Sequence, residues 1–186
     1  MLKPAVFLDR DGVINKDKSY VYKINDFEWI EGAKESIKYF NDKDYYVFVV
    51  TNQSGIARGY YNERDVAFLH DYINDELKNL ESHIDEFFIS PYHPININEY
   101  SHLSHLRKPN TGMLELAASK WPIDKSMSLL IGDKSTDIEC AEKFCIKGYL
   151  FKDTNLFDFI VPSLVIVFIQ ELELIIVAAI LSKKLS

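Results

Sequence analysis

Cysteine is scarce in this sequence, which holds only Cys140 and Cys145 among its 186 residues. Two cysteines this close together cannot frame a disulfide-dependent fold, so the chain has to rely on a buried core, for which it is long enough. The first residues also lack the pattern of a secretory signal. These features predict a cytoplasmic protein whose thiols stay reduced.

Basic residues are also in short supply, because Lys and Arg number 21 against 28 Asp and Glu, which gives a net charge of −7. Non-specific nucleic-acid binding needs a basic surface, so this charge argues against a nucleic-acid partner. An acidic chain can still bind a phosphorylated small molecule where it gathers cations or a metal ion at one site. The sequence has no internal repeat and no low-complexity linker, which favours one domain.

The one long apolar run lies near the C-terminus, over residues 161–181. A membrane span needs about 20 apolar residues in succession, but Glu171 and Glu173 lie in the middle of this run, where carboxylates are costly. We therefore predict a domain over residues 1–160 and an apolar extension over 161–186, and do not expect membrane association. The extension could add an element to the core, cover a neighbouring surface or dock on a membrane.

Short apolar runs alternate with helical patterns along the rest of the chain. The runs predict strands over residues 5–8, 45–50, 87–89, 128–131 and 148–151. The helical patterns cover residues 32–40, 62–80, 114–121 and 136–144, while residues 90–111 are expected to form a long irregular loop. This alternation predicts an α/β fold, a Rossmann-like three-layer sandwich with a parallel sheet and no large cap domain.

Polar residues follow three of the predicted strands, at the edge where parallel sheets place their ligand sites. Asp9 and Asp11 come after the first strand, and Asp133 comes after the fourth. Carboxylates this close repel one another unless a cation or a shared proton intervenes, and Mg²⁺ is the natural cation for oxygen ligands. An isolated Asp-x-Asp is more often an ordinary turn, and the equivalent placement of Asp133 favours the metal site.

Phosphate-binding groups are available at the same edge. Thr51 ends the second strand and, with Asn52, offers a hydroxyl and backbone N–H groups to phosphoryl oxygens. Lys108 closes the long loop and could neutralise both a carboxylate and a phosphate. Each feature by itself also fits a plain strand end or a solvated surface.

In combination, these residues resemble the haloacid dehalogenase superfamily of phosphotransferases. Its four signature elements occur in order, as Phe7–Gly12, Thr51, Lys108, and Gly132–Asp133 with Asp137. Within that superfamily, the chain looks like the D-glycero-D-manno-heptose 1,7-bisphosphate 7-phosphatases and their relatives, the histidinol-phosphate phosphatases. This closer likeness covers roughly residues 4–150 and is carried by Asp9–Asn15, Tyr20–Val21, Thr51–Gly59 and Arg107–Pro109.

The resemblance implies a mechanism. Asp9 would be the nucleophile and Asp11 the general acid and base, while Thr51 and Lys108 would stabilise the transferring phosphoryl group. Mg²⁺ would bind the Asp9 carboxylate, the Asp11 carbonyl and Asp133. The residues expected to contact the substrate are Asp17, Tyr20, Thr51, Asn52, Gln53, Ser54, Arg107, Lys108 and Lys134.

The function implied by the resemblance is removal of the 7-phosphate of heptose 1,7-bisphosphate, in the synthesis of nucleotide-activated heptose for lipopolysaccharide or surface glycan. The expected partner is a small sugar phosphate, and the expected state is a monomer. Histidinol phosphate, or another small phosphomonoester, is an alternative substrate. An alternative of another class is a non-catalytic relative that binds a partner or a membrane. The complete set of catalytic residues argues against this alternative.

One departure from the related phosphatases concerns zinc. Many of them bind a structural zinc ion in the loop before the Arg-Lys-Pro sequence, but the corresponding positions here are Ser90, Tyr92, Ser104 and Leu106. None of these is a good zinc ligand, so no zinc is expected. A rearranged site of three histidines, His93, His102 and His105, is an alternative, although loop histidines more often have no metal.

Overall fold

The computed structural model describes residues 1–96 and 98–162, and its centre is a five-stranded parallel sheet. The strand order is β3-β2-β1-β4-β5. Each neighbouring pair runs parallel. The strands are β1 (Ala5–Leu8), β2 (Tyr46–Asn52), β3 (Glu86–Ser90), β4 (Leu129–Gly132) and β5 (Lys147–Leu150).

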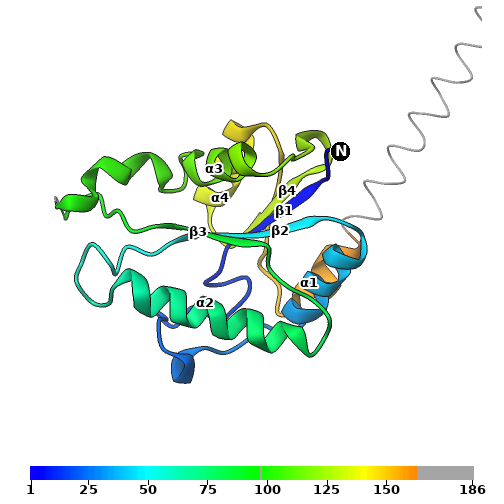
Figure 1. Ribbon diagram of the computed structural model, residues 1–186, viewed down its shortest axis with the longest axis horizontal. Coiled ribbons are helices and arrows are strands. Elements are labelled where there is room, and N and C mark those ends of the chain that lie inside the picture. Colours follow the sequence, from blue (N-terminus) through cyan, green and yellow to red (C-terminus); the bar gives the residue numbers. More distant parts are fainter. Residues whose placement is uncertain (97, 163–186) are drawn as a thin grey trace, which may run out of the picture.

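Helices cover both faces of this sheet (Figure 1). On one face lie α1 (Ala33–Asp42) and α2 (Glu63–Lys78), and on the other lie α3 (Gly112–Lys120) and α4 (Ser135–Phe144). Successive strand residues point to opposite faces, so that Leu8 packs with the first helix pair and Phe7 with the second. The predicted three-layer α/β sandwich is confirmed.

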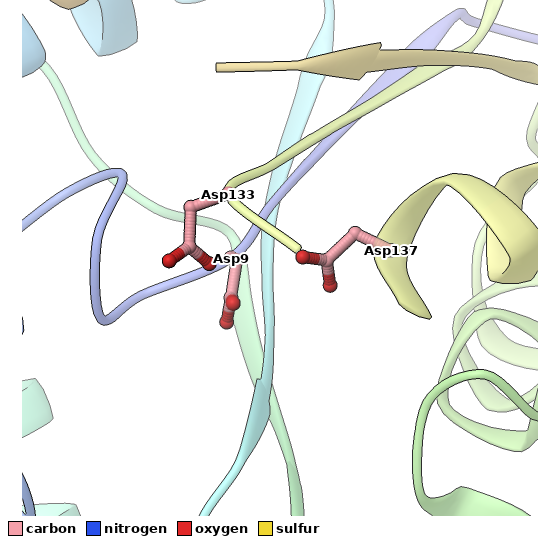
Figure 2. A group of neighbouring side chains, drawn as sticks. All are labelled: Asp9, Asp133 and Asp137. Carbon is pink, nitrogen blue, oxygen red and sulfur yellow. The ribbon is translucent and has the colours of Figure 1, made fainter. Parts of the chain in front are cut away.

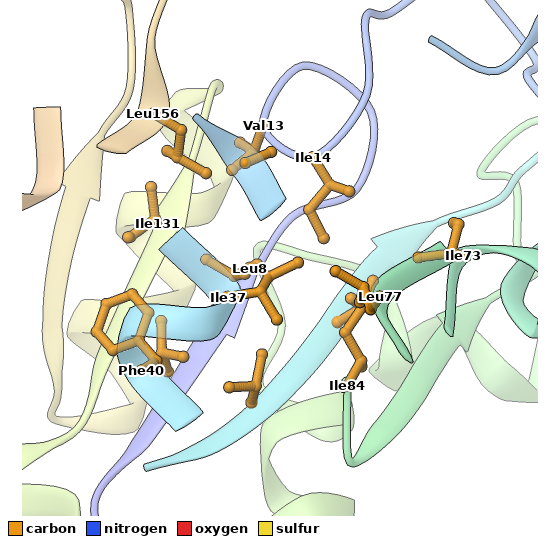
Figure 3. Close-up of a cluster of buried hydrophobic side chains, with 14 of the residues drawn as sticks. Leu8, Val13, Ile14, Ile37, Phe40, Ile73, Leu77, Ile84, Ile131 and Leu156 are labelled. Atoms are coloured by element: carbon orange, nitrogen blue, oxygen red, sulfur yellow. The ribbon is translucent and has the colours of Figure 1, made fainter. Parts of the chain in front are cut away.

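The larger core lies between the sheet and the pair α1 and α2 (Figure 3). Ile37 and Phe40 of α1 and Ile73 and Leu77 of α2 are completely buried there, against Leu8 and its neighbours on the sheet. Burying an aliphatic or aromatic side chain of this size contributes roughly 1.5–3 kcal/mol. This packing fixes the strand ends that carry the polar residues.

The start of α2 is set by Asn62, the first residue of the helical pattern predicted over 62–80. Its side chain accepts hydrogen bonds from the backbone N–H groups of Arg64 (2.8 Å) and Asp65 (3.2 Å). The Asp65 carboxylate accepts in return from the N–H of Asn62 at 2.9 Å. These reciprocal bonds satisfy donors that a helix N-terminus otherwise leaves unpaired.

The long loop after β3 is more regular than the sequence predicts. Residues Glu99–Leu106 form a 3-10 helix, η2, so the expectation of an irregular segment over 90–111 is wrong for this part. Asn98 caps η2 by accepting from the N–H of Tyr100 at 3.0 Å. The helix lacks an apolar periodicity, which is why the pattern of the sequence did not indicate it. Two shorter 3-10 helices are η1 (Ile24–Asp26) and η3 (Lys125–Met127).

After β5 the chain returns to the first helix layer. Leu156 and Ile160 belong to the same buried cluster as α1, and residues 156–162 are helical. Most of the predicted apolar extension lies outside the described residues, so the division of the chain at residue 160 stays a prediction. Across residues 1–96 and 98–162, no helix combines the length and apolarity required to cross a bilayer. The connections of the sheet within these ranges hold no domain-sized cap.

Candidate active site

An open pocket of about 480 Å³ lies at the carboxyl edge of the sheet. Strand order reverses here, since β2 follows β1 on one side and β4 lies on the other. Every residue predicted to be catalytic or to contact substrate lines this pocket: Asp9, Asp11, Asp17, Tyr20, Thr51, Asn52, Gln53, Ser54, Arg107, Lys108 and Lys134. Its lining also includes Ser19, Tyr61, Pro109, Thr136 and Asp137.

Three carboxylates gather at this edge of the sheet (Figure 2). Asp9 follows β1, Asp133 follows β4 and Asp137 lies in the first turn of α4, and each offers an oxygen within 4.8 Å of the others. Two glycines make room for them. A Cβ on Gly12 would lie 2.5 Å from Asp133 Oδ2, and one on Gly132 would lie 2.2 Å from Asp137 Cβ.

Lys108 brings a buried positive charge into this acidic group. Its Nζ lies 3.0 Å from Asp9 Oδ1 and 2.6 Å from Asp137 Oδ1. The loop that carries it is held by Asn52, whose side chain bonds both the N–H (3.1 Å) and the carbonyl (3.2 Å) of Lys108. Burial lowers the pKa of Lys108, but the carboxylates of Asp9 and Asp137 outweigh it and leave that pKa above its ordinary value. Lys108 is therefore a cation here.

One lysine does not balance three carboxylates. Burial raises the pKa of Asp9 to about 7, an effect that Lys108 opposes and Asp137 reinforces. Burial is also the main cause of a raised pKa for Asp133, whose Oδ1 is buried without a hydrogen-bond partner. A group of carboxylate oxygens with more negative than positive charge suits a divalent cation that prefers oxygen ligands, such as Mg²⁺, Ca²⁺ or Mn²⁺. The group Asp9, Asp133 and Asp137 could hold such an ion.

The side chain of Asp11 is not part of that group and is held by three donors. Arg10 Nη2 lies 3.0 Å from Asp11 Oδ2, Asn15 Nδ2 donates to Oδ1 at 2.9 Å, and Gln53 Nε2 donates to Oδ2 at 2.9 Å. The carboxyl group of Asp11 is therefore not among the clustered metal-ligand side chains, and Asp137 is. The prediction for Asp11 itself concerned its carbonyl, which these contacts leave untested.

Arg10 is completely buried and reaches across to α2. Its Nη1 lies 3.2 Å from Nε2 of His70, whose ring stacks on Phe87 with centroids 4.1 Å apart. Burial holds the pKa of His70 well below its ordinary value, and the charge of Arg10 lowers it further. A neutral imidazole can accept a hydrogen bond from the guanidinium, so His70 helps to hold Arg10 in the position from which it contacts Asp11.

Loops at the rim of the pocket are tied to one another by basic side chains. Arg58 Nη2 lies 2.6 Å from His93 Nε2, and Arg107 Nη1 donates to the carbonyl of Tyr92 at 3.3 Å. Lys134 Nζ approaches Asp17 Oδ2 at 3.4 Å.

The three loop histidines of the alternative metal site are not clustered within the described residues. His93, His102 and His105 all lie in the described part of the chain, where Asp9, Asp133 and Asp137 are the group of ligand side chains that comes together. That zinc is absent stays a prediction.

The sequence-based set of site residues omits several groups that line the pocket or contact residues of the site. Asp137 was visible as the second acid of the Gly132–Asp137 motif but was not assigned a role. Tyr61 and His70 had no such signal, because tyrosine and histidine on helical or loop segments are common. Their importance comes from the hydrogen bonds that Tyr61 makes with Gln53 and His70 makes with Arg10, which only the folded chain brings together.

Comparison with known proteins gives the site a context. The family model described as polynucleotide kinase 3 phosphatase matches residues 5–162. A D-glycero-beta-D-manno-heptose-1,7-bisphosphate 7-phosphatase of Rhodopseudomonas palustris is 38% identical over 164 residues, 88% of this chain and 91% of the relative. A D-glycero-alpha-D-manno-heptose-1,7-bisphosphate 7-phosphatase of Campylobacter jejuni is 44% identical over 141 residues, 75% of this chain and 76% of the relative.

The chain belongs to the heptose-1,7-bisphosphate 7-phosphatase family. Solved structures agree with this result and place the chain in the haloacid dehalogenase (HAD) superfamily. A HAD-like phosphatase from Mesorhizobium loti superposes with a TM-score of 0.75 at 32% identity, covering 80% of this chain and 72% of that one. The D,D-heptose 1,7-bisphosphate phosphatase of B. bronchiseptica, complexed with magnesium and phosphate, gives a TM-score of 0.72 at 25% identity and covers 86% of both chains.

Proposed function

We propose that this chain is a Mg²⁺-dependent phosphatase that removes the 7-phosphate of D-glycero-D-manno-heptose 1,7-bisphosphate through an aspartyl-phosphate. The observation that carries the proposal is the buried contact of Asp9 with Lys108, 3.0 Å long, in a pocket that Asp11 and Thr51 also line. A chain with this geometry in this family fits a role in the synthesis of nucleotide-activated heptose. A cytoplasmic monomer remains part of the proposal.

The first step is an in-line attack by the Asp9 carboxylate on phosphorus. Asp9 Oδ1 already accepts from the N–H of Arg10 at 2.8 Å and lies beside Lys108, so Oδ2 is the oxygen left for the reacting centre. The P–O bond to the sugar breaks as the bond to Asp9 forms, and Asp11 protonates the leaving alkoxide. Lys108 and the hydroxyl of Thr51 stabilise the negative charge on the phosphoryl oxygens.

The second step is hydrolysis of the aspartyl-phosphate. Asp11, now ionised, takes a proton from a water molecule that attacks phosphorus, which releases phosphate and restores the Asp9 carboxylate. Asp9, Asp133 and Asp137 would hold a Mg²⁺ ion near the phosphoryl group. When bound, that ion supplies charge neutralisation and orientation of the phosphoryl oxygens.

The test is release of inorganic phosphate with Mg²⁺ from a panel of substrates. The panel holds both anomers of heptose 1,7-bisphosphate, fructose 1,6-bisphosphate, histidinol phosphate and an oligonucleotide with a 3′-phosphate. We expect kcat/KM for one heptose anomer to exceed kcat/KM for each of the other substrates by at least about 10³-fold, since specificity is a difference in transition-state binding. Asp9→Asn removes the nucleophile and serves as the inactive control.

Other outcomes assign other functions. A preference for histidinol phosphate would assign a histidinol-phosphate phosphatase. A preference for the oligonucleotide would assign a 3′-phosphatase of nucleic acid, in line with the matched polynucleotide kinase 3 phosphatase model. Activity of the wild type that equals that of Asp9→Asn on every substrate would favour a non-catalytic relative.

A further inference from the structure

Both N–H donors and the oxygen of the Gln53 amide meet protein groups. Its side chain is 2% exposed. Nε2 donates to Asp11 Oδ2 and to Thr51 Oγ1, both at 2.9 Å, and Oε1 accepts from the hydroxyl of Tyr61 at 2.7 Å. The backbone N–H of Gln53 donates to the carbonyl of Ser90 at 2.8 Å. A primary amide has two N–H donors, and both are used here, so neither is left for a ligand.

The orientation of this amide is set at both ends. Turning it over would place Oε1 against Asp11 Oδ2, which already accepts from Arg10 Nη2, so two acceptor oxygens would face each other. At the other end, burial raises the pKa of Tyr61 to about 12, so its hydroxyl keeps its hydrogen and donates to Oε1. The carboxylate and the phenol thus select one arrangement of Gln53.

That arrangement decides what the hydroxyl of Thr51 can do. A hydroxyl group has a single hydrogen and can accept as well as donate. Because Gln53 donates to Thr51 Oγ1, the hydrogen of Thr51 is left for a different acceptor. Thr51 lines the pocket, where the acceptor would be a phosphoryl oxygen.

Tyr61 is itself held firmly. It is 7% exposed, and its ring stacks on that of Tyr22 with centroids 4.8 Å apart and an interplanar angle of 18°. Gly55 lets the ring approach the backbone, since a Cβ there would lie 2.2 Å from Tyr61 Cε1. The hydroxyl is therefore delivered to Gln53 from a fixed position.

We propose that Tyr61 and Gln53 are positioning residues, through which the phenol fixes one amide that in turn orients both Asp11 and Thr51. This inference rests on the proposed phosphatase function and deepens it, because Gln53 is then assigned to the catalytic groups and not to the sugar. Tyr61 touches neither Asp11 nor Thr51 in the contacts described, so its effect has to pass through Gln53.

The first test is Tyr61→Phe, which removes one oxygen atom from a stacked ring. Without that donor the amide loses the contact that fixes Oε1. We expect kcat to fall about tenfold, because the free energy of one lost buried hydrogen bond corresponds to a rate factor of about this size. KM should stay within about twofold of the wild-type value. Tyr22→Phe is the matched control. It removes the same atom from the stacked neighbour and should leave both constants within about twofold of the wild type. Unchanged kcat in Tyr61→Phe would overturn the proposal.

The second test is a double-mutant cycle with Gln53→Met, which keeps the size of the side chain and removes its hydrogen bonds. If Tyr61 acts through Gln53, adding Tyr61→Phe to Gln53→Met costs no further kcat. Additive losses would mean that Tyr61 acts by another route, and the proposal would fail.

Measuring the cycle on p-nitrophenyl phosphate as well as on heptose 1,7-bisphosphate separates the two proposals. A positioning role lowers kcat for both esters, whereas a sugar contact of Gln53 raises KM for the heptose ester alone and contradicts us. If the wild type hydrolyses only the aryl ester, heptose 1,7-bisphosphate is excluded as the substrate. The double-mutant cycle can still be measured on the aryl ester.

A readout that needs no activity is the side-chain amide of Gln53 in ¹⁵N-resolved NMR spectra. We expect two separate, slowly exchanging amide hydrogens in the wild type and in Tyr22→Phe, and fast exchange in Tyr61→Phe. Equal exchange in all three proteins would refute the positioning role even if no ester were hydrolysed.

Discussion

Lys108 is the side chain on which the candidate site depends most. It is buried between Asp9 and Asp137, so its removal leaves two carboxylates facing each other without a cation. Breaking a buried pair is more costly than never having formed it, because the remaining charge stays desolvated. The same charge is the one that would oppose the negative charge of a transferring phosphoryl group.

We therefore expect Lys108→Met to lower kcat by at least about 10³-fold and to reduce thermal stability. Lys143→Met is the control, since Lys143 is an exposed lysine of α4 whose Nζ contacts the carbonyl of Pro109 from outside the pocket. Steady-state kinetics and thermal melts of the two variants make the comparison. Equal activity of the two variants would show that the charge of Lys108 has no part in the reaction.

Asp9 gives a prediction about pH. Its pKa of about 7 lies above the ordinary value of 3.8, so between about pH 4 and 7 the metal-free native state binds more protons than the unfolded state. Stability of the metal-free protein should then fall as pH rises through this window. Asp9→Asn removes the buried charge and should raise the Tm in EDTA by a few degrees at pH 8 and much less at pH 5. An equal difference at both pH values would contradict this assignment.

At the scale of the elements, strand ends and helix starts bring the site together. The polar residues sit where β1, β2 and β4 end, and α4 begins directly after β4 and carries Asp137 in its first turn. Helix α2 is held in place by its cap and by apolar packing. Changes at a cap should therefore affect the free energy of unfolding through the helix alone.

Asn62→Ala tests this for α2. Loss of the capping box should lower the free energy of unfolding by about 1 kcal/mol, because the donors of the first turn lose their acceptor. Asn79→Ala is the matched control at the other end of α2, where the cap bond runs from the backbone N–H to the carbonyl of Leu77, and should change it by less than about 0.5 kcal/mol. Urea unfolding measures both. Equal losses would mean that the capping box does not stabilise α2.

For the whole molecule, a bound divalent cation links the site to global stability. A ligand that binds only the native state stabilises it by RT ln(1 + [L]/Kd), about 2.7 kcal/mol at 100 times Kd. Because Asp9 follows β1, while Asp133 follows β4 and Asp137 lies in α4, an ion held among them ties together segments that are far apart in the chain.

Mg²⁺ should accordingly raise the Tm of the wild type in a concentration-dependent manner. Asp133→Asn should abolish most of this rise, whereas Glu142→Gln, which removes an exposed carboxylate of α4, should leave it intact. Differential scanning calorimetry across a Mg²⁺ series gives the answer. A full Mg²⁺ response in Asp133→Asn would exclude this carboxylate as a ligand.

What the sequence shows by itself is what local patterns encode. Continuous apolar runs such as Ala5–Leu8 indicated buried parallel strands, and the helical pattern over 62–80 indicated the helix that forms α2. The acids after two of those runs indicated a charged site at the sheet edge, because the carboxyl ends of parallel strands meet there. The 3-10 helix η2 was not predicted, since its eight residues have no apolar periodicity that would indicate a helix.

Only the tertiary structure decided how the side chains of the site divide their hydrogen bonds. That Lys108 lies between Asp9 and Asp137, that His70 supports Arg10, and that the amide of Gln53 serves protein groups are all contacts between distant or differently oriented segments. Periodicity reports the face on which a residue lies, and it holds no information about the partner that each polar atom meets across that face. Those partners follow from packing, which joins the strand ends, the loop of Lys108 and α2 at fixed distances.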